Sequence, residues 1–176
     1  NVKIDNKSIL KYGDYSVLSF HATKVFTTFE GGAIISKNKI LESKVCKLRN
    51  FAIEGPEQIS GVGINAKMTE PAAALGCLQL KDVKKNIAER KKISLTYNKS
   101  FKSCTFIRIL DIPTDINYNY AYYPIFFKEG FSIREYVYKK LLDHGIVCRK
   151  YWYPLITSHS HYKKYKISDL SNAKKL

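Results

Sequence analysis

One lysine of this chain, Lys24, stands where its amine could do chemistry. It follows the apolar, β-prone run of residues 15–20 and precedes the glycine pair Gly31-Gly32. Its neighbours Val25 and Phe26 are apolar, which favours partial burial. A lysine amine can form a Schiff base with a carbonyl group, and burial near other cations lowers its pKa so that it can move a proton. Position alone does not select this lysine, because the chain has 25 lysines and most lysines are surface charges.

Two strands and a helix are predicted around Lys24. Residues 15–20 predict a strand that delivers residues 19–24 as the loop at its carboxyl end. Ligands collect at that end of the strands in α/β sheets. Residues 32–36 predict a second strand. Residues 38–50 then predict an amphipathic helix, because apolar side chains recur at helical spacing at Ile40, Leu41, Val45 and Leu48.

A loop and a long helix are expected next. Residues 51–65 contain several glycines and one proline, which is typical of an exposed and often functional loop. Thr69 is the predicted N-cap of a helix that begins with Glu70 and Pro71 and reaches the region of Tyr97. One apolar stripe is expected along this helix, made by Ala73, Cys77, Leu80, Val83 and Ile87.

After Ser100 the sequence predicts short strands and one helix. Residues 105–110 and 120–127 predict strands, and residues 131–144 predict a helix that stops at Gly145. Residues 146–148 predict a further strand. This β-β-α-β order indicates a small α+β domain over residues 101–176, after a first domain over residues 1–100. The end of the chain, residues 159–176, is polar and lysine-rich, and we expect it to be partly disordered.

The charge of the chain is strongly positive. The formal net charge is +15, and lysine supplies 25 of the 30 basic residues. This balance favours a lysine-rich solvated surface, because arginine is the better reader of phosphates and base edges. A basic, non-catalytic module that binds nucleic acid or a phosphorylated partner stays open as the alternative. The sequence holds no apolar run long enough to span a membrane.

Metal and disulfide patterns are missing. The four cysteines, Cys46, Cys77, Cys104 and Cys148, are scattered without a C-x-x-C pair, so we expect reduced, mostly buried thiols in a cytoplasmic protein. His159 and His161 form too small a cluster for zinc, which takes about four ligands. No metal site is predicted.

Two blocks of the sequence resemble one enzyme family. Ser19-Phe20-His21-Ala22-Thr23-Lys24, continued through Ile35, resembles the cofactor-lysine motif of the DegT/DnrJ/EryC1/StrS sugar aminotransferases. The segment from Gly61 through Leu80, with Gly63-Ile64-Asn65-Ala66-Lys67-Met68-Thr69-Glu70 at its centre, is similar to a second motif of that family. The resemblance implies an α/β chain with the PLP-dependent transferase fold type I, aspartate aminotransferase-like. The chain would hold part of the large domain, followed by the small α+β C-terminal domain.

The resemblance also assigns roles in a site for pyridoxal 5'-phosphate (PLP). Lys24 would bond the cofactor and, once released, move the proton. Ser19 would bind the cofactor phosphate. Asn65 would reach the phosphate held by the partner subunit, which implies an obligate homodimer with shared active sites. Without the motif, Asn65 reads as a polar residue that caps a turn.

A third block is similar to the family's small domain near the substrate entrance. It is the stretch of residues 149–155, with Tyr151 and Trp152 at its centre. Residues 117–124 are similar to the strand that opens the same domain. Tyrosine-rich stretches also pack simply as core, so packing and substrate contact both stay open for Tyr151 and Trp152.

Within the family, the two motifs look most like transaminases of dTDP-4-keto-6-deoxyglucose that use L-glutamate as amino donor, in the biosynthesis of surface polysaccharide sugars. Lys24 argues against a dehydrating branch, which carries histidine there. The family's ring-stacking aromatic and pyridinium-pairing aspartate have no counterpart, since Asp5, Asp14 and Asp82 lie in no matching motif. The chain begins at Asn1 and has Met68 as its one methionine, so we expect a piece of a longer enzyme that is inactive alone.

Overall fold

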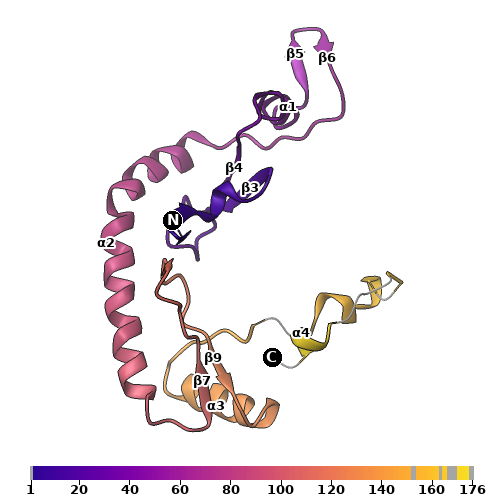
Figure 1. Cartoon of the computed structure of the whole chain (residues 1–176). Helices are drawn as coiled ribbons and strands as arrows, with labels where there is room; N and C mark the ends of the chain where they lie inside the picture. Colours follow the sequence, from indigo (N-terminus) through magenta and orange to yellow (C-terminus); the bar gives the residue numbers. More distant parts are fainter. Residues whose placement is uncertain (1, 152–153, 163, 166–169, 175–176) are drawn as a thin grey trace. The chain divides into compact units, whose positions relative to one another are not determined.

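The computed structural model describes residues 2–151, 154–162, 164–165 and 170–174. The chain divides into two compact units (Figure 1). The first consists of Asn1–Ser100 with Asp111–Tyr123, and the second of Phe101–Leu110 with Pro124–Leu176. The domain predicted over residues 101–176 therefore includes a segment, Asp111–Tyr123, that packs with the first unit.

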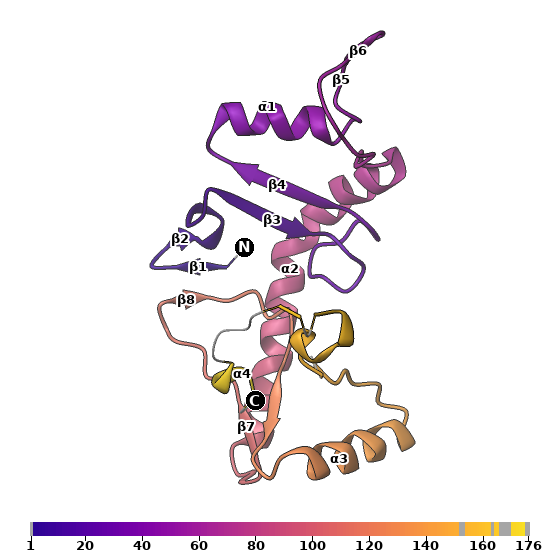
Figure 2. The same cartoon turned by 90° about the vertical axis from the view of Figure 1, so that its right-hand side faces the viewer.

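The centre of the first unit is the hairpin of β3 (Tyr15–Ser19) and β4 (Gly32–Ser36), as predicted for residues 15–20 and 32–36. The strands are antiparallel, and Ser19 pairs with Gly32 where the connecting loop begins and ends (Figure 2). One face of the hairpin is covered and the other is open: Val17 and Ile34 pair across the strands and are 78% and 51% exposed. A separate three-stranded sheet has the strand order β2 (Lys7–Ser8), β1 (Lys3–Ile4), β8 (Ile116–Asn117).

Helix α1 (Lys39–Leu48) confirms the helix predicted over residues 38–50. Asn38 caps it, because its side-chain oxygen accepts hydrogen bonds from the backbone N–H groups of Ile40 and Leu41. The predicted loop over residues 51–65 is only partly a loop. It contains a short hairpin, β5 (Ile53–Gly55) and β6 (Gln58–Ile59), which the proline and glycines in this stretch concealed.

Helix α2 (Glu70–Phe101) is the predicted long helix. Its predicted apolar stripe is wrong at its first three members: Ala73, Cys77 and Leu80 are exposed, while Val83 and Ile87 are half-buried. The covered face combines Leu75, Val83 and Ile87 with small and polar side chains, and its two buried residues are Gly76 and Ser94. Hydrophobicity alone could not find this face, because close packing of the helix against a loop selects small residues there.

The second unit pairs β7 (Ile107–Ile109) with β9 (Ile125–Phe127), inside the strands predicted for residues 105–110 and 120–127. Helix α3 (Phe131–Asp143) follows. As predicted, it stops at Gly145: this residue has φ +74°, and the N–H groups of Gly145 and Ile146 bond back to Leu142 and Leu141. Short helical turns follow at Ile156–Ser158, Ser160–Tyr162 and Ser171–Lys174.

Two further predictions for the second unit concern residues 146–148 and 159–176. The strand predicted for residues 146–148 is absent: these residues pair with no strand in the described part of the chain, and Val147 is 81% exposed. Strand propensity without a partner ladder does not make a strand. The disorder expected for residues 159–176 falls partly on residues 163, 166–169 and 175–176, which lie outside the described residues.

The cysteines are free, but the prediction that they are mostly buried is wrong. Cys46, Cys77 and Cys148 are exposed and Cys104 is half-buried. Cys46 and Cys77 lie on outer faces of α1 and α2, so their helical positions decide their exposure. Among the described residues, no group of histidine, cysteine and carboxylate side chains could hold a metal ion.

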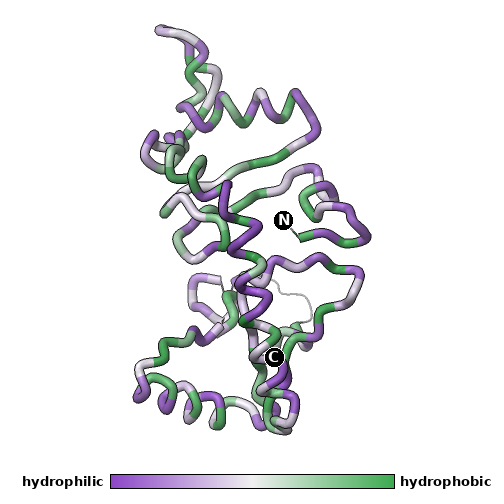
Figure 3. The backbone as a smooth tube through the Cα atoms, turned by 90° about the vertical axis from the view of Figure 1, so that its left-hand side faces the viewer, coloured by the Kyte–Doolittle hydropathy of each residue, from purple (hydrophilic) through white to green (hydrophobic). Residues whose placement is uncertain are grey.

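Polar and apolar segments alternate along the backbone, including α2 (Figure 3). No helix in the described part of the chain combines the length and hydropathy needed to cross a membrane.

Candidate active site at the β3–β4 loop

The loop between β3 and β4 carries Lys24 and is closed by its own backbone. The N–H of Phe20 donates to the carbonyl of Gly31 over 2.9 Å. The carbonyl of Phe20 accepts from the N–H of Thr28 at 3.0 Å and from the Thr27 hydroxyl at 3.1 Å. These bonds fold the loop back onto the end of β3, so Lys24 is presented from an ordered turn.

His21 braces the start of this turn. Its carbonyl accepts the N–H of Lys24 at 2.9 Å, and its Nδ1 accepts the N–H of Thr23 at 3.3 Å. Its Nε2 lies 3.5 Å from Glu30 Oε1. Because Nδ1 acts as acceptor, the neutral ring carries its proton on Nε2, which faces Glu30. His21 therefore ties the beginning of the loop to its end.

The loop rests on α2 through its buried residue. Thr28 is 2% exposed, and its hydroxyl donates to the carbonyl of Glu30 at 2.8 Å. Gly76 of α2 lies against Thr28 and Phe26, and the Phe26 ring meets that of Phe20 edge-on, with centroids 4.7 Å apart. A Cβ on Gly31 would collide with the Thr28 hydroxyl. A glycine at position 31 is thus required for the loop to close.

Lys24 itself is half-buried. Its Nζ lies 3.5 Å from the hydroxyl of Tyr122 and 5.8 Å from the centre of that ring. No carboxylate among the described residues pairs with Lys24, whereas Lys39, Lys47, Lys92 and Lys150 all lie within ion-pair distance of a glutamate. An amine that no carboxylate holds is available to react with a carbonyl group.

Ser19, predicted as the first residue of the loop that carries Lys24, is the last residue of β3 and lies directly before that loop. It is exposed at the end of β3, and its Oγ accepts the N–H of His21 at 3.4 Å. Since Ser19 Oγ acts as an acceptor there, its hydroxyl can still donate one hydrogen bond. The amine and the hydroxyl therefore belong to one short, ordered stretch of chain.

Asn65 is not brought to Lys24 within this chain. It is exposed, and it forms an isolated antiparallel bridge with Asn50 beyond the end of α1. Its neighbours hold it there. The N–H groups of Ile64 and Ala66 donate hydrogen bonds to the carbonyl groups of Leu48 and Arg49, both at 2.8 Å. None of the described hydrogen bonds joins Asn65 to the loop of Lys24.

Tyr122 is a neighbour of Lys24 that the sequence analysis does not find. Residues 120–127 predict a strand, yet the regular strand is limited to Ile125–Phe127. Tyr122 lies in the segment Asp111–Tyr123, which returns to the first unit. No local pattern signals this return, because a contact between residues 98 positions apart depends on tertiary packing.

The third predicted block is described only in part, since Trp152 and Tyr153 lie outside the described residues. Tyr151 is 43% exposed. The neighbouring Lys150 donates to Glu135 of α3 at 2.8 Å, which ties this stretch to the second unit. Packing and substrate contact both stay open for Tyr151.

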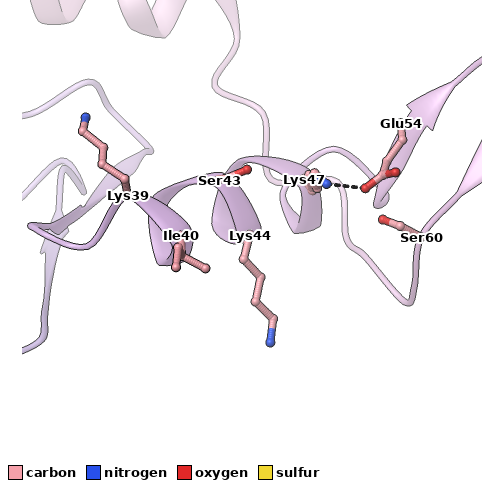
Figure 4. Close-up of a pocket in the computed structure, with 7 residues that line it drawn as sticks. All are labelled: Lys39, Ile40, Ser43, Lys44, Lys47, Glu54 and Ser60. Atoms are coloured by element: carbon pink, nitrogen blue, oxygen red, sulfur yellow. Dashed lines mark hydrogen bonds and ion pairs between the residues drawn. The ribbon is translucent and has the colours of Figure 1, made fainter.

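A shallow groove lies elsewhere, on the outer side of α1 (Figure 4). Lys47 and Glu54 pair at its rim, and Ser60 lies beside Glu54. The groove contains none of the predicted site residues; its lining is Lys39, Ile40, Ser43, Lys44, Lys47, Glu54 and Ser60. We attach no catalytic role to it, because exposed lysines on one helix face are ordinary solvated charges.

Solved structures share this fold. PseC of Helicobacter pylori, an aminotransferase involved in the biosynthesis of pseudoaminic acid, superposes with a TM-score of 0.89 at 26% identity, over 99% of this chain and 48% of that one. DesI, solved in the presence of its TDP-sugar product, gives 0.87 at 27% identity, over 97% and 44%. The expected fold class is confirmed: the chain has the PLP-dependent transferase fold type I over about half the length of these proteins.

The family follows from the sequence comparison. The model of the DegT/DnrJ/EryC1/StrS aminotransferase family matches residues 2–176, and the chain belongs to that family. A dTDP-4-amino-4,6-dideoxy-D-glucose transaminase of Shigella dysenteriae is 37% identical over 99% of this chain and 48% of its own length. A UDP-4-amino-4,6-dideoxy-N-acetyl-beta-L-altrosamine transaminase of Campylobacter jejuni is 33% identical over 90% and 43%. The chain spans about half the length of the curated relatives it matches.

Proposed function

We propose that this chain is part of a PLP-dependent aminotransferase that acts on nucleotide-linked sugars. The observation that carries the proposal is the β3–β4 loop: it carries one half-buried lysine amine, paired with no carboxylate among the described residues, and it begins at Ser19, whose side chain is exposed. Membership of an aminotransferase family supports the same reading. PLP supplies an electron sink that stabilises negative charge on the carbon next to the substrate nitrogen.

The residues of the loop suit that cofactor by their chemistry. An aldehyde needs an amine, which Lys24 offers, and a phosphate needs hydroxyl and N–H donors, such as the hydroxyl of Ser19. Lys24 Nζ would hold the cofactor and later carry a proton between two carbons, a role that a flexible, half-buried amine can fill. Asn65 would donate a hydrogen bond across the dimer interface, to the cofactor phosphate that the partner subunit holds.

We propose a nucleotide-linked keto-deoxyhexose as the amine acceptor, in the biosynthesis of surface polysaccharide sugars. Among such sugars we propose dTDP-4-keto-6-deoxyglucose, because the Shigella dysenteriae relative is a dTDP-4-amino-4,6-dideoxy-D-glucose transaminase. From the family resemblance we propose L-glutamate as the donor. The net charge of +15 favours a substrate that carries a diphosphate. The free cysteines fit a reducing compartment, and we propose the cytoplasm.

We propose a homodimer, because by the family resemblance Asn65 serves the site of the other subunit. The chain also exposes more surface than its own packing explains, as expected where the rest of a longer chain or a second subunit covers it. It exposes 14333 Å², whereas a compact monomer of this length exposes about 8,800 Å² and two separate domains of half the length together about 10,600 Å². Much of the excess is apolar: Leu78 and Leu80 of α2 are 60% and 63% exposed, and Val62 is 96% exposed. Further protein would cover these residues.

Mixed dimers of the complete protein test whether Asn65 acts across the interface. Lys24→Ala and Asn65→Ala each inactivate their own homodimer. If Asn65 serves the other subunit, a mixed dimer has one site with both residues intact, so an equal mixture regains about a quarter of wild-type activity. If Asn65 serves its own subunit, every site lacks one residue and no activity returns. Transamination is followed with the keto-sugar nucleotide and glutamate.

The isolated 176-residue chain provides the second test. We propose that it is inactive alone, because the groups that pair with the cofactor ring are not among its recognisable motifs. Transaminase turnover by this chain would contradict that proposal. Binding to duplex DNA that weakens steeply with salt, without any response to PLP, would instead favour the basic non-catalytic module.

A further inference from the structure

Tyr122 belongs to a segment that α2 holds in place from both sides. The guanidinium of Arg90 donates to the carbonyl of Ala121 at 3.2 Å. The hydroxyl of Tyr123 donates to Asn98 at 2.7 Å, and its ring lies 4.9 Å from that of Tyr97. The residues on either side of Tyr122 are therefore fixed to one rigid helix.

The side chain of Tyr122 meets Lys24 with two parts at once. Its hydroxyl lies 3.5 Å from Lys24 Nζ, at the long end for a hydrogen bond. Its ring centre lies 5.8 Å from the same nitrogen, just within the range in which an aromatic ring attracts a cation. Each contact is weak alone, but both act on one atom from one anchored residue.

We propose that Tyr122 is a positioning residue for Lys24. Whenever the lysine amine is not covalently bonded, the phenol oxygen accepts a hydrogen bond from it and the ring stabilises its charge. This keeps Nζ at the mouth of the loop instead of in bulk water. The inference deepens the proposed function, in which Lys24 must leave the cofactor and return to it in each cycle.

A purely structural role for Tyr122 predicts something different. Tyr122 is 38% exposed, so a packing role would make its removal loosen the segment Asp111–Tyr123 as a whole. A positioning role predicts an effect confined to Lys24. The two roles separate when the reactivity of each lysine is measured individually.

Competitive labelling makes this measurement without cofactor. The complete protein is treated with a trace of acetic anhydride at fixed pH, and mass spectrometry gives the labelling rate of each lysine. Wild type is compared with Tyr122→Phe, which keeps the ring, and Tyr122→Leu, which loses ring and hydroxyl. Tyr120→Phe is the control, because the Tyr120 ring contacts Tyr118 and not Lys24.

We expect Lys24 to label about two- to fivefold faster in Tyr122→Leu, the factor that an exposed cation–ring contact supplies, and by a smaller factor in Tyr122→Phe. Other lysines keep their rates. An unchanged rate at Lys24 in both variants contradicts the proposal. So does a rise shared by the other lysines, since a positioning contact acts on Lys24 alone.

The outcome is independent of the proposed function. If Lys24 proves not to hold PLP, the labelling response to Tyr122 is still measurable, and the two ideas fail separately. In the complete protein a second readout is the rate at which PLP becomes fixable on Lys24 by borohydride. We expect this rate to fall in Tyr122→Phe although the amine reacts faster with acetic anhydride, because PLP held in a site needs Nζ at one position and the free anhydride does not. The final extent of fixation is unchanged.

Discussion

Gly76 of α2 lies directly against Thr28 of the loop that carries Lys24: a Cβ on Gly76 would stand 3.0 Å from the Thr28 methyl carbon. Thr28 is 2% exposed and has little room to yield. The distance between helix and loop is therefore set by the absence of a side chain. Any residue that fills this gap pushes the lysine loop away from α2.

Gly76→Val is expected to lower the free energy of unfolding by about 1–3 kcal/mol, because its branched side chain overpacks the contact with Thr28. Ala88→Val is the matched control, since it places the same side chain at an exposed position of the same helix. Denaturant unfolding of both variants gives the comparison. Equal stability of the two would show that the loop does not rest on Gly76.

Gly63→Ala tests how the segment of Asn65 is held. A Cβ on Gly63 would run into the backbone of Phe51 and Ala52 and stand 2.8 Å from the carbonyl oxygen of Leu48. Backbone cannot swing aside as a side chain can, so we expect a loss of about 1–3 kcal/mol in the free energy of unfolding.

Gly61→Ala is the control for that variant. Gly61 lies two residues earlier and has no atom within 4 Å of its Cβ position. We expect its free energy of unfolding to stay within about 0.5 kcal/mol of wild type. If both variants unfold alike, close backbone approach at Gly63 is not what anchors this segment.

Much of this architecture is predictable from local sequence. The strand at residues 32–36, the helix over residues 38–50 and the stop of α3 at Gly145 depend on neighbours a few positions away, and local sequence predicts all three. The exposure of Leu80 and the contact of Tyr122 with Lys24 depend instead on how segments that are far apart in the sequence pack against one another. Periodicity carries no information about that choice.

The pH dependence of the second unit is expected to involve Glu135. Hydrogen bonds from Lys150 and Arg134 hold the pKa of this carboxyl below its ordinary value of 4.5. A lowered folded-state pKa means that the stabilisation is present above pH 4.5 and is lost as the pH falls through the folded-state value. We therefore expect Glu135→Gln to be less stable than wild type at pH 7, with the difference shrinking below pH 4.5.

Glu129→Gln is the control for that titration, because Glu129 is exposed and belongs to none of the described ion pairs. Thermal unfolding at several pH values measures both variants. Added salt should reduce the effect at Glu135, since the carboxyl is only partly covered. A difference between Glu135→Gln and wild type that persists unchanged down to pH 2 would contradict the assignment.

The central claim is that Lys24 is the lysine that bonds the cofactor. The direct measurement is to incubate the complete protein with PLP, reduce it with borohydride, and locate the fixed group by peptide mass spectrometry among all its lysines, which include the 25 of this chain. We predict one group per subunit, on Lys24, and no stoichiometric fixation in Lys24→Arg. Fixation on another lysine, or spread over many exposed lysines, would contradict the claim.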